Sequence, residues 1–132
     1  MRNLARLLVS KITLVIAKTH LKKVDGLRQI ETRINRLILP NKKTWIDYRG
    51  YELLVDPTDY LGRQLWTYGE YEPEAEELIS THLEQGDIAF DIGANIGQFT
   101  ICMRDAVGKT GAIYSFEPLS KNRNLLNCTL NR

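Results

Sequence analysis

The segment GDIAFDIGANIGQFT, residues 86–100, constrains the fold more than any other part of the sequence. A buried-strand pattern at 88–92 leads into a turn bracketed by Gly93 and Gly97, and an amphipathic helical stretch follows. Glycine permits backbone angles that other residues avoid, so this pattern is typical of a sharp strand-to-helix turn. A second strand follows and ends at Glu117. The strand–helix–strand order predicts an α/β fold with a parallel sheet.

Apolar periodicity predicts the elements around this unit. The expected helices cover residues 3–18, 20–38, 72–86, 97–107 and 118–131, and the expected parallel strands cover 88–92 and 112–117. Pro73 suits the first turn of the helix expected at 72–86, and Gly86 suits the left-handed backbone conformation that commonly ends a helix. Residues 43–56 are rich in aromatic and β-branched residues around Arg49-Gly50, which predicts a β-hairpin. Residues 58–71 are expected to form a loop or a short helix.

Charge is distributed unevenly along the chain. Residues 1–43 hold eleven Lys and Arg against two acidic residues, whereas residues 44–132 hold seven against fourteen. We therefore expect three segments: a basic helical region at 1–40, a hairpin with its connecting loop at 41–71, and an α/β domain at 72–132. The complementary charges favour basic helices that dock on the acidic part, with binding to anionic lipid or nucleic acid as the alternative.

The N-terminal segment is too polar for a membrane span. Its longest uncharged run, 12–17, is far short of the roughly 20 residues that a span needs, and Lys11 breaks a signal-peptide core. These features predict a cytoplasmic protein with no transmembrane segment. Cys102 and Cys128 lie in expected helices without metal-ligand spacing, which favours small buried thiols over a disulfide or a metal site.

The glycine turn also restricts the ligand. Open α/β sheets bind ligands at the carboxyl ends of their strands, where Glu117 would accept hydrogen bonds from two ribose hydroxyls. A dinucleotide fingerprint fails, because Asn95 and Gln98 stand at its second and third glycine positions. Asp91, two residues before Gly93, would repel a diphosphate but tolerate a cationic ligand. S-adenosylmethionine fits, since it carries a sulfonium and an ammonium and no phosphate.

Several motifs together resemble one family. DIGANIG at 91–97 and FEP at 116–118, with Asn122, Asn127 and Asn131 after them, are similar to the first two motifs of the FkbM family of S-adenosylmethionine-dependent methyltransferases. YGEYEPE, at 68–74, resembles the segment that precedes the cofactor strand in that family. The resemblance covers residues 66–132, about half of the chain.

The resemblance implies a class I, Rossmann-like methyltransferase fold. It also implies methyl transfer to a hydroxyl oxygen of a small molecule or glycan, and residues 72–132 would be the S-adenosylmethionine-binding domain. The implied cofactor-binding residues are Asp91, Gly93, Asn95 and Gly97 on the methionine side, Glu117 at the ribose and Glu72 at the amino-acid end. A nucleic-acid partner is not expected, and catalytic residues are expected further along the chain.

Two parallel strands are too few for a finished domain of this type. We therefore expect a C-terminally incomplete product of a longer methyltransferase. Two other interpretations stay open at this point. The chain could be a non-catalytic fragment or binding module that uses its basic helices, or, less favoured, part of an NAD-dependent oxidoreductase. The sequence gives no signal for the acceptor, the catalytic residues or the oligomeric state.

Overall fold

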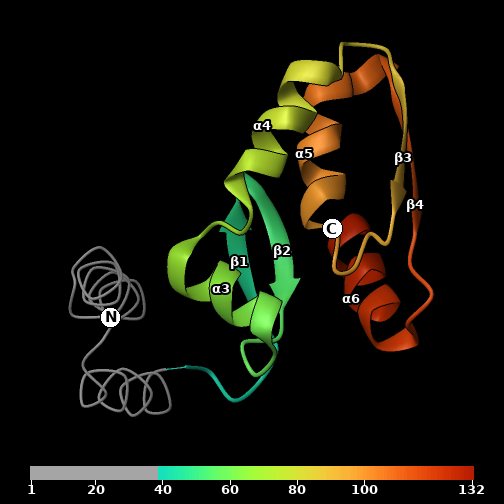
Figure 1. The fold of residues 1–132 in the computed structure, drawn as a ribbon. Helices are drawn as coiled ribbons and strands as arrows, with labels where there is room; N and C mark the ends of the chain where they lie inside the picture. Colours follow the sequence, from blue (N-terminus) through green and yellow to red (C-terminus); the bar gives the residue numbers. More distant parts are fainter. Residues whose placement is uncertain (1–38) are drawn as a thin grey trace, which may run out of the picture. The chain divides into compact units, whose positions relative to one another are not determined.

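A computed structural model describes residues 39–132 (Figure 1). The helices predicted at 3–18 and 20–38 lie outside the described residues. The described part is a mixed α/β structure with four α-helices and two two-stranded sheets, one of which is parallel. The expected mixture of helices and parallel strands is therefore confirmed.

By its internal contacts the chain divides into two compact units. The described residues of the first are 39–43 and 56–69, and the second comprises 44–55 and 70–132. No helix within the part that the structure describes is long and apolar enough to cross a membrane.

The first unit contains helix α3, Tyr60–Tyr68, which forms where a loop or short helix was predicted. Asp59 caps its start, because its Oδ1 accepts a hydrogen bond of 2.8 Å from the Gly62 N–H. Gly69 ends the helix in a left-handed conformation with φ 79°. A side chain at position 62 would meet the Asp56 carbonyl oxygen at 2.1 Å, so this position needs glycine.

The second unit begins with the predicted hairpin. Strands β1, Thr44–Tyr48, and β2, Tyr51–Val55, pair antiparallel with Tyr48 opposite Tyr51. The two turn residues, Arg49 and Gly50, have φ of 54° and 81°. Two positive φ angles give a turn whose twist matches that of the strands, which confirms the predicted hairpin.

The parallel pair follows as the sequence predicts. Strands β3, Ile88–Ile92, and β4, Ala112–Phe116, are joined by helix α5, Gln98–Val107, and the short 3-10 turn η2, Gly108–Thr110. Helix α6, Ser120–Leu130, comes after β4. Helix α5 packs against both strands and against the preceding helix, α4 (Figure 1).

Helix α4 covers Pro73–His82 and is shorter than predicted. Leu83 ends it in an extended conformation, so Gly86 is not its cap. Gly86 does adopt a left-handed φ of 94°, but it lies in the turn into β3 and donates its N–H to the Val107 carbonyl.

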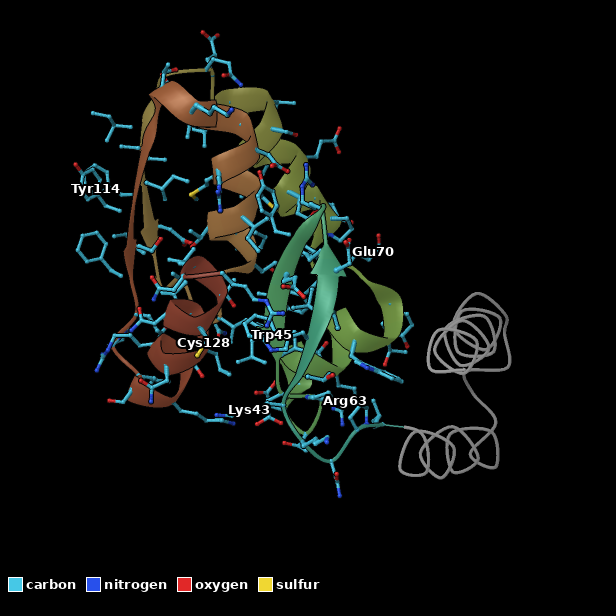
Figure 2. The ribbon with its side chains drawn as sticks, turned by 180° about the vertical axis from the view of Figure 1, so that it is seen from behind. Lys43, Trp45, Arg63, Glu70, Tyr114 and Cys128 are labelled. Atoms are coloured by element: carbon cyan, nitrogen blue, oxygen red, sulfur yellow. The ribbon has the colours of Figure 1, made fainter. Side chains whose placement is uncertain are left out.

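The two faces of the β3–β4 pair differ. Ala89 and Asp91 point to the buried face, whereas alternate residues point away from α5 and are exposed. The exposed set is Ile88, Phe90, Ile92, Tyr114 and Phe116. Tyr114 stands clear of the helices in Figure 2. The strand at 88–92 is therefore buried on one face only.

The two cysteines also differ. Cys102 is buried on α5, but Cys128 is exposed on α6, and both are free thiols. The expectation of two buried thiols is wrong for Cys128. Helix α6 buries Leu125, Leu126 and Thr129 instead, and Cys128 lies off that face.

Candidate functional site

The glycine turn is tied to the end of the neighbouring strand. The N–H groups of Gly93 and Ala94 both donate to the Phe116 carbonyl oxygen, at 2.8 and 3.0 Å. Gly93, Asn95 and Gly97 all have positive φ, of 85°, 52° and 97°. The turn therefore adopts the left-handed geometry that its residue types favour.

Glu117 lies directly against this turn. Its Oε2 accepts a hydrogen bond of 2.9 Å from the Asn95 N–H, and its Oε1 accepts one of 2.7 Å from the Leu119 N–H. The structure thus brings together two predicted site residues that are 22 positions apart. Since each carboxylate oxygen has two lone pairs, each retains one for a ligand hydroxyl.

The two glycines of the turn, Gly93 and Gly97, have different surroundings. A side chain at Gly93 would have nothing within 4 Å, so the main chain there is open to an approaching molecule. A side chain at Gly97 would meet the Leu126 Cδ1 at 2.8 Å. Gly97 therefore lets α5 begin close to α6, and the side chain of Leu126 fills the space beside it.

Asp91 lies on the buried face of β3, with 5% of its surface exposed. Its Oδ2 accepts a hydrogen bond of 2.5 Å from the Thr100 hydroxyl, which lies 3.1 Å from the Ser115 hydroxyl. Burial raises the pKa of the Asp91 carboxyl, the Thr100 hydrogen bond opposes this rise, and the nearby Glu117 charge adds to it. The Thr100 hydroxyl of α5 thus links Asp91 of β3 to Ser115 of β4 on the covered face of the sheet.

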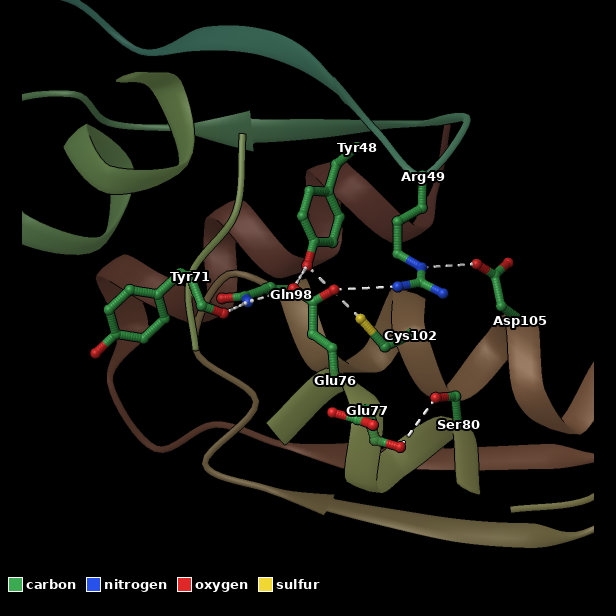
Figure 3. A network of polar contacts seen from close by, with 9 residues as sticks. All are labelled: Tyr48, Arg49, Tyr71, Glu76, Glu77, Ser80, Gln98, Cys102 and Asp105. Carbon is green, nitrogen blue, oxygen red and sulfur yellow. Dashed lines mark hydrogen bonds and ion pairs between the residues drawn. The ribbon is translucent and has the colours of Figure 1, made fainter. Parts of the chain in front are cut away.

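Glu72 lies in the segment before α4. It is exposed and has a left-handed backbone, with φ 52° and ψ 60°, although it is not a glycine. The preceding carbonyl, that of Tyr71, accepts a hydrogen bond of 2.6 Å from Gln98 Nε2 (Figure 3). Gln98 directly follows Gly97, so one side chain links the Glu72 segment to the glycine turn.

Three residues in this arrangement were not among the predicted site residues: Gln98, Thr100 and Ser115. Gln98 and Thr100 are buried polar residues of α5, and Ser115 is a half-buried polar residue of β4. A polar residue on the apolar face of a helix is the sequence signal that could have marked Gln98 and Thr100, because buried polar groups require partners.

The arrangement offers binding groups for a polar ligand with hydroxyls. It combines an anchored carboxylate, Glu117, with an open main chain at Gly93. Residues 39–132 contain no group of three His, Cys, Asp or Glu side chains suited to a metal ion.

Comparisons with models of known protein families, with curated proteins and with solved structures return no match for this chain. The similarity to the FkbM family therefore stays a prediction from the motifs at 68–74, 91–97 and 116–118.

Proposed function

We propose that this chain carries the cofactor-binding part of an S-adenosylmethionine-dependent methyltransferase with a Rossmann-like sheet. The observation that carries the proposal is the contact between Glu117 and the glycine turn through the Asn95 N–H. It places a carboxylate and an open backbone at the carboxyl ends of two parallel strands, where α/β sheets bind ligands.

The chemistry of the groups fits this cofactor. The free lone pairs of Glu117 suit two ribose hydroxyls, and the open Gly93 suits a ligand that passes along the main chain. The charge of Glu117 favours a cationic ligand over a diphosphate. Asp91 contributes less to this selection than its position in the sequence suggests, because it is buried and bound to Thr100.

Bound S-adenosylmethionine would supply the methyl group. The described residues would bind and orient the cofactor, since methyl transfer depends chiefly on in-line positioning. By the FkbM resemblance, the acceptor is a hydroxyl of a small molecule or a glycan.

Calorimetric titration with S-adenosylmethionine and S-adenosylhomocysteine tests the proposal. Wild type should bind both, and Glu117→Ala should weaken both by about ten- to a hundredfold, the loss expected for hydrogen bonds to a charged group. Glu117→Gln keeps an acceptor for the Asn95 N–H and should lose less.

Glu77→Ala is the matched control, because Glu77 is an exposed glutamate on α4. It should bind like wild type. The proposal fails if wild type binds neither compound, or if Glu117→Ala keeps full affinity while circular dichroism shows a native fold. Quenching of NADH fluorescence by wild type would instead favour the oxidoreductase interpretation.

A further inference from the structure

A second polar cluster lies beside the start of α5, formed by Tyr48, Tyr71, Glu76 and Gln98 (Figure 3). We call it the Gln98 network. Gln98 is 3% exposed, and its Nε2 donates to the Tyr71 carbonyl at 2.6 Å and to Glu76 Oε1 at 3.3 Å. The Tyr48 hydroxyl also donates to Glu76 Oε1.

Arg49 holds Glu76 in place and is itself held by Asp105. Arg49 Nη1 lies 3.0 Å from Glu76 Oε2, and Arg49 Nε lies 3.0 Å from Asp105 Oδ2. Burial raises the pKa of Tyr48 far above its usual range, so its hydroxyl stays protonated and remains a donor. Both oxygens of Glu76 are thus engaged, and the amide of Gln98 is held on fixed partners.

The Gln98 network joins two segments of the proposed cofactor site, the glycine turn and the segment that contains Glu72. Gln98 follows Gly97 in the chain, and Tyr71 precedes Glu72. The left-handed backbone of Glu72 is a conformation that persists only where the surroundings enforce it. The hydrogen bond from Gln98 to the Tyr71 carbonyl supplies such a constraint, since it fixes the peptide next to Glu72.

We propose that Gln98 is a positioning residue that holds the Glu72 carboxylate beside the glycine turn to receive the ammonium group of the methyl donor. Gln98 itself need not touch the ligand. An ammonium has three donors and a carboxylate only acceptors, so the pair forms charge-assisted hydrogen bonds. This inference rests on the proposed function, and it adds a positioning residue to the amino-acid end that the FkbM resemblance assigns to Glu72.

Two ligands separate this role from a general structural one. S-adenosylhomocysteine carries the ammonium, whereas 5′-methylthioadenosine has the same adenosine and neutral thioether without the amino-acid end. In calorimetric titrations, Gln98→Leu should weaken S-adenosylhomocysteine binding about tenfold, the loss of one charge-assisted hydrogen bond, and leave 5′-methylthioadenosine binding unchanged. Equal losses for both ligands, or no loss for either, would overturn the inference.

A second variant covers the case in which Gln98→Leu fails to fold. Glu72→Gln changes an exposed side chain and should show the same selective loss. Equal affinities of this variant and wild type for S-adenosylhomocysteine would overturn the inference whatever the Gln98 variant does. Gln85→Leu, which alters an exposed glutamine, is the matched control and should leave both affinities unchanged.

The outcomes for wild type distinguish the two proposals. Binding of neither ligand would remove the proposed function together with this inference. Binding of both ligands with equal affinity would keep an adenosine site at Glu117 but exclude an ammonium contact at Glu72. Tighter binding of S-adenosylhomocysteine than of 5′-methylthioadenosine, lost in both variants, supports the inference.

Discussion

The residues of strands β3 and β4 alternate between two faces of the pair, and these faces have opposite character. On the covered face, Asp91 of β3 and Ser115 of β4 both form hydrogen bonds with the Thr100 hydroxyl of α5. On the other face, Phe90 stacks on Tyr114 and Phe116 with ring centroids 5.3 and 6.3 Å apart, and all three rings are at least half exposed.

The difference shows that burial on this sheet is determined by the covering helix, α5, and not by the hydrophobicity of the strand residues. The apolar residues of β3 are mostly on the exposed face, and its buried positions hold Ala89 and Asp91. A contiguous apolar surface of this kind is unusual on a monomer. Stability should therefore depend on the covered face, and changes on the other face should be tolerated.

The largest contrast is expected between two isoleucines. Ile101→Ala, at a position 2% exposed on α5, should lower the free energy of unfolding by about 2–5 kcal/mol, because it leaves a cavity. Ile92→Ala, at a position 75% exposed, should change it by less than about 0.5 kcal/mol. Urea unfolding followed by circular dichroism measures both. Equal losses would contradict the division between the faces.

Removal of one hydroxyl should have the next largest effect. Thr100→Val deletes the donor to Asp91 and leaves a buried carboxylate without that partner, which should cost about 1–3 kcal/mol in the same urea experiment. Thr81→Val is the control, since Thr81 is exposed on α4 and bonds carbonyls of its own helix. A Thr100 variant as stable as this control would show that the polar cluster is dispensable.

The contribution of Asp91 to folding stability should be smaller and should depend on pH. Burial raises the pKa of Asp91 above its ordinary value of 3.8, so the folded state binds the proton more tightly than the unfolded state. Above about pH 4 the folded chain holds more protons, and this contribution to stability falls as pH rises through the raised pKa. The stability of wild type relative to Asp91→Asn should therefore decrease from pH 4 to pH 7 in urea titrations. A difference that is constant over this range would contradict the prediction.

The smallest change in stability is expected on the exposed aromatic face. Phe90→Ala should alter the free energy of unfolding by less than about 0.5 kcal/mol, because Phe90 is 60% exposed. It should also lower the fluorescence of a bound hydrophobic dye, which reports exposed apolar surface. A loss of stability like that of Ile101→Ala would show that this face is covered in solution.

Local rules predicted the elements of the second unit well. The hairpin follows from strand-forming residues around Arg49-Gly50, and the parallel pair follows from the strand–helix–strand order. The approach of Glu117 to the turn was also predictable, because the carboxyl ends of adjacent parallel strands meet at one edge of the sheet.

The side-chain partners were harder to predict. The contact of Gln98 with Tyr71 spans 27 positions, and that of Tyr48 with Glu76 spans 28, so neither has a local signal. The burial of Asp91 could have been inferred from strand alternation, since it shares a face with Ala89. The prediction placed Asp91 in the cofactor site because it lies two residues before Gly93, and it did not use this alternation.

The packing of α6 on β2 has a consequence for synthesis on the ribosome. The Leu54 N–H donates to the Thr129 hydroxyl at 3.2 Å, and the Arg132 guanidinium lies 4.5 Å from the centre of the Trp45 ring. The hairpin therefore emerges 75 residues before the helix that packs on it. At about 5–20 residues per second this delay is roughly 4–15 seconds. Throughout this interval the nascent hairpin lacks that helix, so its packing cannot be completed until α6 has been synthesised.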